Sequence, residues 1–250
     1  MMSDANSETA NSGPNATDVK SSSTITTIFL LLLLSGLAGG ASWALAEKTG
    51  NLATIPLEIS SKNYEYAELN AATIKVNTIN GALVYGGLGL LLAAAVILAL
   101  KLAGAMRGRL AIAGLILGAL GGALPCLVVM PLHWQNRNDD PSVLDLTMPL
   151  VYHAGLWVPI GLAVGLVFGY SRFGSFKAGS KELVTGGIGA LVGTLFYEFV
   201  GAALLPMDKT VEPVAATPTA RLLAHLAVSL GIALSLAWSM KSAAKASRAE

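Results

Sequence analysis

Five ionisable side chains lie within or at the ends of long apolar runs, where ionisable groups are rare. They are Glu198, His153, His225, Arg221 and His133. A charged group at the centre of a bilayer costs about 2.5–3.5 kcal/mol or more, so such groups are usually paired, hydrated or functional. A carboxylate near imidazoles can accept a proton or a cation, and the same groups bind zinc. We therefore take these five residues as a candidate polar cluster.

The polar cluster has several interpretations. The functional one is a water-accessible pocket in the outer half of the membrane, with Glu198 as a proton or cation acceptor. The structural one is a bridge from Glu198 to Arg221 or to His225, which would hold the fifth and sixth apolar runs together. Arg221 and His225 are four residues apart and therefore share a helix face. A divalent metal site is a third interpretation, although no two histidines have a tight ligand spacing.

The elements that must position these residues are six apolar runs. A bilayer core about 30 Å thick requires about 20 residues of helix. The chain is 54% hydrophobic and only 12% charged, against about 25% charged in soluble domains. The fold class predicted is an all-α polytopic transmembrane helical bundle. Its six spans are expected at about 24–46, 82–102, 110–132, 148–170, 183–206 and 220–240.

A single domain is predicted, because the spans share one bundle. The transmembrane helical domain covers 24–240, with an external loop at 47–81. The polar segment 1–23 is rich in Ser, Asn and Thr and is predicted to be disordered. Residues 241–250 form a basic tail, which is predicted to lie in the cytoplasm.

The first apolar run has a second interpretation. Ala44-Leu45-Ala46 has the small-x-small form of a signal-peptidase site, so the run could be a cleaved signal. Cleavage would leave five spans. The orientation of the chain after Glu47 is the same in both cases.

The distribution of basic residues predicts the orientation. Three basic residues follow each of the second, fourth and sixth spans, and Lys20 brings that side to ten; the other side has six basic and nine acidic residues. Cytoplasmic loops collect Lys and Arg. The chain is therefore predicted to be a multi-pass protein of the cell membrane, in a bacterial inner membrane, with its C-terminus cytoplasmic. The short external segments Trp134–Asp145 and Asp208–Pro218 are predicted to be plain connections.

Small residues recur every four positions in four of the spans and predict tight helix contacts. Small side chains let helix backbones approach within a membrane, where burying leucine adds little. The third and fourth spans carry Gly114, Gly118, Gly122, Gly161, Gly165 and Gly169. The first span carries Gly36, Gly40 and Ala44, and the sixth carries Ala227, Gly231, Ser235 and Ser239.

A weak internal repeat is a further hypothesis. Leu83-Val84-Tyr85 matches Leu150-Val151-Tyr152, and the glycines Gly118 and Gly122 match Gly189 and Gly193. The second and third spans would then duplicate the fourth and fifth. Parallel repeats of this kind occur in transporter folds.

The sequence lacks the motifs of the common enzyme classes. It contains no HExxH, no phosphate-binding P-loop and no CxxC, and its sole cysteine is Cys126. We expect no cofactor, and an intramembrane enzyme is the least supported class. The best hypothesis is a small-solute or cation transporter or permease component; the alternative is a structural or assembly subunit. The expected partners are membrane lipids and a second copy or other membrane subunits, with no nucleic acid.

Overall fold

The computed structural model describes residues 16–49, 52–56, 59, 66–108, 111–139, 147–205, 210 and 212–249. Six helical segments of this described part are long and apolar enough to cross a membrane. No strand is present in it. The predicted all-α bundle of six spans is confirmed. Of the segment 1–23 that is predicted to be disordered, residues 1–15 lie outside the described residues, and residues 16–23 are helical, so the prediction is wrong for them.

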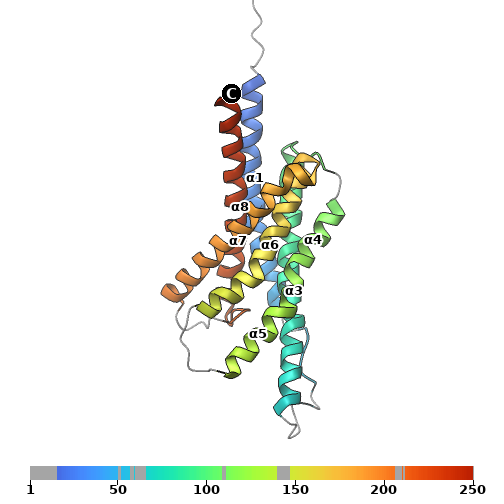
Figure 1. Cartoon of the computed structure of the whole chain (residues 1–250), viewed down its shortest axis with the longest axis vertical. Helices are drawn as coiled ribbons and strands as arrows, with labels where there is room; N and C mark the ends of the chain where they lie inside the picture. The colour runs from blue at the N-terminus through green and yellow to red at the C-terminus, as the bar shows by residue number, and fades with distance from the viewer. Residues whose placement is uncertain are drawn as a thin grey trace, which may run out of the picture.

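The helices of this bundle differ in length from the predicted spans (Figure 1). They are α1 (Ala16–Thr49), α3 (Tyr66–Leu102), α4 (Ala111–Ala123), α5 (Cys126–Asp139), α6 (Thr147–Phe173), α7 (Phe176–Leu204) and α8 (Pro218–Ala249). The third span consists of α4 and α5, which are separated at Pro125, a residue without a backbone N–H. α3 begins well before the predicted span, so the second half of the segment 47–81 is helical.

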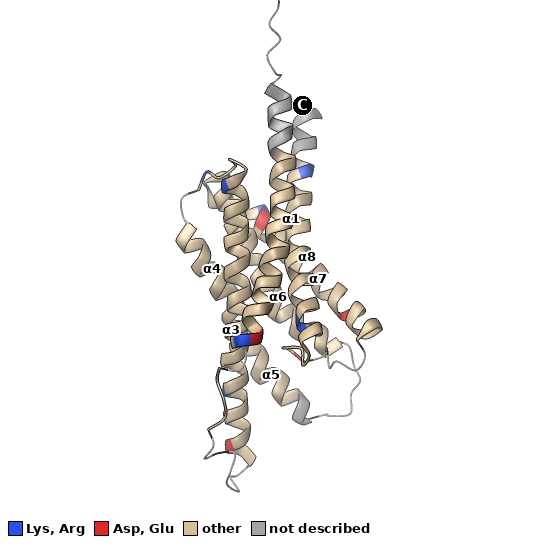
Figure 2. Cartoon of the chain, turned by 180° about the vertical axis from the view of Figure 1, so that it is seen from behind, with Lys and Arg blue, Asp and Glu red and all other residues tan. Residues whose placement is uncertain are grey.

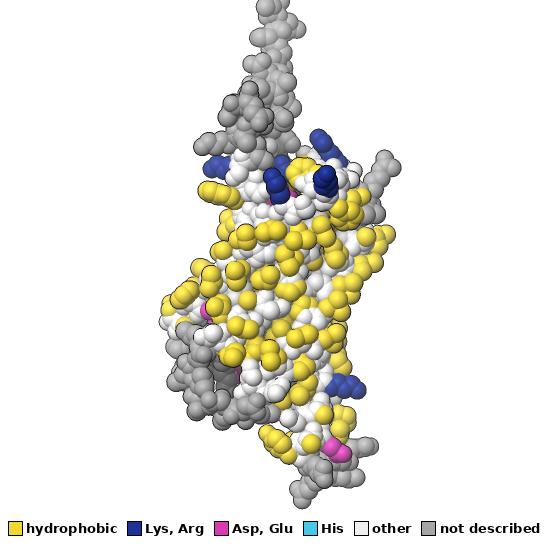
Figure 3. Space-filling model, viewed as in Figure 1, with side chains coloured by type: hydrophobic (Ala, Val, Ile, Leu, Met, Phe, Trp, Pro, Cys, Tyr) yellow, Lys and Arg dark blue, Asp and Glu magenta, His cyan; other side chains and the backbone are white. Residues whose placement is uncertain are grey.

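The six spans form a closed ring. α1 packs between α3 and α8, α4 packs against α3 and α6, and α7 packs between α6 and α8. The α3–α4 and α6–α7 connections lie at the same end of the bundle as the C-terminus of α8 (Figure 1). Lys and Arg side chains gather at this end, beyond a band of hydrophobic side chains (Figure 3). We call it the basic end, and the other the opposite end.

Charged residues lie mainly toward these two ends of the bundle (Figure 2). Arg107 lies in the α3–α4 connection at the basic end, and the helix turns next to the α6–α7 connection at that end carry Arg172, Lys177 and Lys181. The predicted grouping of the basic segments on one side therefore agrees with the order of the helices.

Glycines bring α6 and α7 into backbone contact. A β-carbon placed on Gly161, Gly165 or Gly169 would lie 2.3, 2.1 or 2.4 Å from a backbone oxygen of α7. Side chains do not tolerate such distances. The close approach of these two helices therefore requires glycine at all three positions.

The contact of α4 with α3 is equally close. A β-carbon on Gly118 would lie 2.4 Å from the Gly89 oxygen, and one on Gly122 would lie 1.9 Å from the Tyr85 oxygen. Gly114 instead faces side chains, since a β-carbon there would lie 3.1 Å from Val167 and 3.2 Å from Ile97. The first turns of α4 thus have more room than its last turns.

The small-residue face predicted for the first span is wrong. A β-carbon on Gly40 would meet nothing within 4 Å, and Ala44 is exposed. Gly39 instead faces α8, because a β-carbon there would lie 2.7 Å from Ser229 Oγ and 3.1 Å from the His225 oxygen. The buried face of α1 consists of Thr27, Leu31, Ser35, Ala38, Gly39, Ser42 and Ala46.

The small residues of α8 face α7, as the predicted contacts between helices require. The contacts of the glycines that define the internal repeat, however, contradict that repeat. β-Carbons on Gly189 and Gly193 would lie 2.6 and 2.5 Å from backbone oxygens of α8. Their supposed counterparts, Gly118 and Gly122, face α3. One pair therefore contacts the preceding span and the other pair the following span, so the repeat hypothesis is wrong.

Candidate functional site

A buried histidine–carboxylate pair joins α6 to α7. His153 Nδ1 is hydrogen-bonded to Glu198 Oε1, and the two side chains are only 1% and 7% exposed. His153 Nε2 lies 3.0 Å from the Glu212 carbonyl oxygen. A carbonyl oxygen only accepts, so Nε2 must carry a hydrogen. The bond between Nδ1 and Oε1 then holds one further proton, and the pair has no net charge whichever atom carries that proton.

Aromatic rings enclose this pair. The His153 ring lies 4.8 Å from Trp157 and 5.1 Å from Tyr197, measured between ring centroids, and the Tyr197 ring meets it edge-on. Trp157 and Tyr197 also contact each other at 5.2 Å. The helical spacing of His153 and Trp157 places both on one face of α6. The pair therefore lies in a mainly apolar environment.

The described residues Thr210 and 212–217 of the α7–α8 connection lie over the His153–Glu198 pair, on the side of the opposite end. Their carbonyl groups accept hydrogen bonds from three spans: Thr210 from Tyr197, Glu212 from His153, and Pro213 from Tyr85. We call these residues the plug. The prediction of a plain connection here is wrong, because its backbone bonds to buried side chains rather than to solvent.

Arg221 does not pair with Glu198. Its Nε donates to Glu47 Oε1 at 2.6 Å and its Nη2 to Glu47 Oε2 at 3.0 Å. Its Nη1 donates to the Ala215 and Ala216 oxygens at 2.8 and 3.0 Å. The predicted Glu198–Arg221 bridge is therefore wrong. Arg221 joins α8 to α1 and to the plug.

His225 also faces α1 rather than Glu198. Its Nδ1 lies 3.0 Å from Ser42 Oγ, and its ring stacks with Tyr85 at 6.4 Å. The predicted Glu198–His225 bridge is therefore wrong as well. Trp43 adds a third link between these helices, since its Nε1 donates to the Pro218 oxygen at 3.0 Å.

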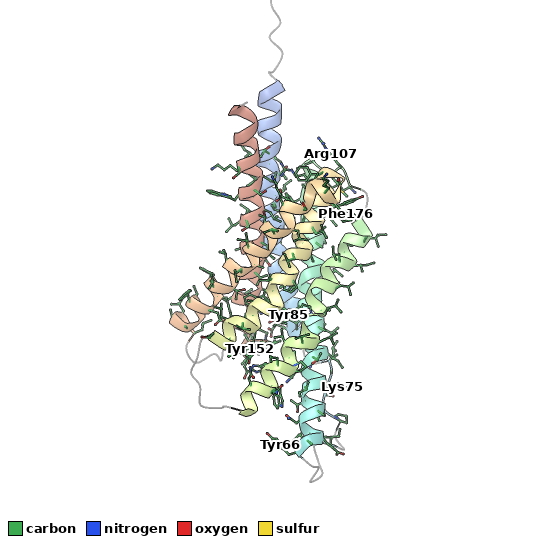
Figure 4. The ribbon with its side chains drawn as sticks, in the orientation of Figure 1. Tyr66, Lys75, Tyr85, Arg107, Tyr152 and Phe176 are labelled. Carbon is green, nitrogen blue, oxygen red and sulfur yellow. The ribbon has the colours of Figure 1, made fainter. Side chains whose placement is uncertain are left out.

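A polar cavity of about 260 Å³ lies at the opposite end, next to the plug. Its polar lining comes from Asn77, Asn80, His133, Trp134, Glu212 and Arg221. His133 also contacts the Tyr152 ring edge-on at 5.1 Å. Tyr85 and Tyr152 mark this half of the bundle in Figure 4. The cavity can accommodate a small polar solute or a hydrated cation.

The candidate cluster is thus divided into three places. His153 and Glu198 meet each other, His133 and Arg221 line the cavity, and His225 faces α1. Among the residues that the structure describes, no three His, Cys, Asp or Glu side chains lie together as metal ligands would. The described geometry gives the metal interpretation no support.

Three important residues were missed in the sequence. Tyr85 and Tyr197 bind the plug, and Glu182 is a second buried carboxylate in α7. The predicted fifth span begins at residue 183 and therefore leaves Glu182 outside the membrane helices. The sequence signal for the burial of Glu182 is its position three residues after Gly179 and four before Gly186, which places it on the same helix face as these two glycines of α7.

No protein-family profile, curated protein or solved structure matches this chain. Its function is therefore inferred from the geometry. The arrangement holds a proton between His153 and Glu198, and Glu212 connects this pair to the polar cavity. Glu212 of the plug contacts both, because its carbonyl oxygen accepts a hydrogen bond from His153 and the residue lines the cavity.

Proposed function

We propose that this integral membrane protein is a small-solute or cation transporter or permease component. In this proposal the cavity at the opposite end admits the solute, and the His153–Glu198 pair binds a proton beneath it. One observation carries the proposal: His153 donates to the Glu212 carbonyl, and Glu212 lines the cavity. Displacement of a single peptide group would therefore expose the pair to the cavity.

The chemistry follows from the neutrality of the pair. If the shared proton leaves through the cavity, a net negative charge stays among Trp157, Tyr197 and the glycine faces. An unpaired charge in such an environment is costly. The pair then recovers a proton or attracts a cation, which couples solute entry to charge movement.

A structural or assembly subunit is the second candidate. It is favoured by the burial of His153 and Glu198 and by the partner that each His153 nitrogen has inside the bundle. Under this alternative the pair holds α6, α7 and the plug together and never exchanges its proton.

Proton flux into proteoliposomes distinguishes the two candidates. With an inside-negative potential imposed by potassium and valinomycin, and a pH dye trapped inside, the parent protein should acidify the lumen faster than protein-free vesicles do. Glu198→Gln should reduce this rate to that of protein-free vesicles, because the amide cannot exchange the proton. Glu68→Gln is the matched control, since Glu68 is exposed on α3. A parent rate equal to that of protein-free vesicles would favour the structural candidate.

We also propose that the protein lies in a bacterial inner membrane with its basic end and C-terminus in the cytoplasm. The excess of Lys and Arg at that end supports this orientation. The contacts of Ser42 and Trp43 with α8 support retention of the first span, because removal of residues 1–46 would leave His225 without its Ser42 partner and the Pro218 carbonyl without its Trp43 donor.

Cysteine labelling tests the orientation. In a Cys126→Ala background, Ser175→Cys should resist a membrane-impermeant thiol reagent added to intact cells, while Ala216→Cys should react. Both positions are exposed, at the basic and the opposite end respectively. The reverse pattern would refute the orientation, and an intact mass lacking residues 1–46 would refute the retained span.

A further inference from the structure

A second polar groove lies at the basic end, far along α7 from the His153–Glu198 pair. It has a volume of about 800 Å³ and runs between the first turns of α7 and the turns of α8 from Ser235 to Ser242. Lys177, Lys181 and Glu182 line it from α7, and Trp238 and Ser239 line it from α8. The groove therefore presents both signs of charge at the membrane boundary.

The two lysines supply the positive part of the groove. Lys177 and Lys181 are exposed and four residues apart, so their ammonium groups project from one face of α7. Ammonium groups bind phosphate as compact point charges. This side of the groove fits a phosphate group.

Glu182 supplies an unsatisfied acceptor. Its Oε1 accepts a hydrogen bond from Ser239 Oγ at 2.8 Å and lies 4.0 Å from Arg172 Nη1. Its Oε2 is buried and has no hydrogen-bond partner among the described residues. A buried acceptor without a donor is unfavourable, so a ligand N–H group at this oxygen would be stabilised.

Apolar side chains border the groove on the side of the lipid. Trp238 is 72% exposed and Ile188 is 54% exposed, and both line the groove. Tryptophan favours the boundary between headgroups and acyl chains. A ligand in the groove can therefore extend an acyl chain along these side chains while its headgroup lies between the lysines and Glu182.

We propose that this groove binds the headgroup of an aminophospholipid, in which a phosphate and a primary ammonium are joined by a short linker. The phosphate lies against Lys177 and Lys181. The ammonium donates to Glu182 Oε2. A phosphatidylcholine headgroup has the same phosphate but no N–H donor, so it satisfies only half of the site.

Native mass spectrometry of the full chain in detergent, with added phosphatidylethanolamine or phosphatidylcholine, tests this proposal. Phosphatidylethanolamine should bind about tenfold more tightly, the effect expected from one hydrogen bond to a charged group. Glu182→Gln should remove most of this preference, and replacing both lysines by glutamine should weaken the binding of both lipids. Lys101→Gln, at the same end but outside the groove, should change neither affinity.

A series of N-methylated lipids tests the parent protein without any variant. Affinity should fall most at the last step, from the tertiary to the quaternary amine, because only the quaternary group has no N–H donor. Equal affinity across the series, or tighter binding of phosphatidylglycerol that is insensitive to Glu182→Gln, would overturn the assignment. If equimolar soluble phosphoethanolamine displaces the lipid completely, the ligand of the groove is a soluble headgroup compound and not a lipid.

Discussion

Gly165→Ala should lower the free energy of unfolding by about 3 kcal/mol or more, because overpacking of a close contact forces the backbones apart. The new β-carbon would lie 2.1 Å from the Glu182 oxygen, which is backbone and cannot rotate away. α6 and α7 would have to separate along their whole glycine face. Reversible unfolding in mixed detergent micelles, or loss of the folded protein on heating, measures the effect.

Gly40→Ala is the matched control. It is the same substitution in another membrane helix, at a position where a β-carbon meets nothing within 4 Å. Alanine is the better helix former by about 1 kcal/mol, so this variant should be neutral or slightly more stable. Equal stability of the two variants would show that the glycine face of α6 is not a close contact in the folded protein.

His153→Ala should destabilise the protein by about 3–5 kcal/mol, the cost of removing one partner from a buried ion pair. Glu198 would remain buried with its hydrogen-bond partner removed, and the Glu212 carbonyl would lose its donor as well. In a Glu198→Gln background the same substitution should cost at least about 1 kcal/mol less, because no charge is left behind. A double-mutant cycle on unfolding in detergent gives this coupling.

His225→Ala provides the control for that cycle. His225 has Ser42 as its hydrogen-bond partner, so its substitution should be additive with Glu198→Gln. Coupling of Glu198 to His225 but not to His153 would contradict the observed pairing. If the effects of His153→Ala and His225→Ala on stability are each additive with that of Glu198→Gln, Glu198 has no imidazole partner in solution.

The six spans could be predicted because every helix that crosses the membrane must be long enough to match the thickness of the bilayer core. The ends of the helices could not, because hydropathy reports only the apolar part of each helix. α3 begins at Tyr66 and α7 at Phe176, in both cases among polar residues outside the hydrocarbon. For this reason the second half of the external loop and the position of Glu182 were misjudged.

The partner of Glu198 could not be predicted, because the depth of a residue in the membrane does not determine how its helix is rotated about its own axis. His153, Arg221 and His225 all lie at depths that could reach it. The choice depends on which faces of α6, α7 and α8 meet, and that is decided by the glycine contacts. The hydrogen bonds of the plug come from backbone carbonyls, which every residue carries, so no residue type reveals them.

The face of α1 was misjudged for a different reason. Between Ser35 and Ser42, seven of eight residues are Gly, Ala or Ser, so a spacing of four fits several faces equally well. Gly114, Gly118 and Gly122 are separated mainly by larger residues, and their single face is unambiguous. Small-residue spacing identifies an interface only where large residues occupy the rest of the helix.

The links from α1 to α8 impose an order on biogenesis. Ser42 and Glu47 are separated from His225 and Arg221 by 183 and 174 residues of chain. At the usual 5–20 residues per second, the ribosome needs about 10 to 35 s to deliver those partners. The first helix must therefore wait in or beside the insertion machinery with its polar side chains unmatched. The ring closes only when the last helix has been made, so synthesis of the C-terminal span is the step that completes the protein.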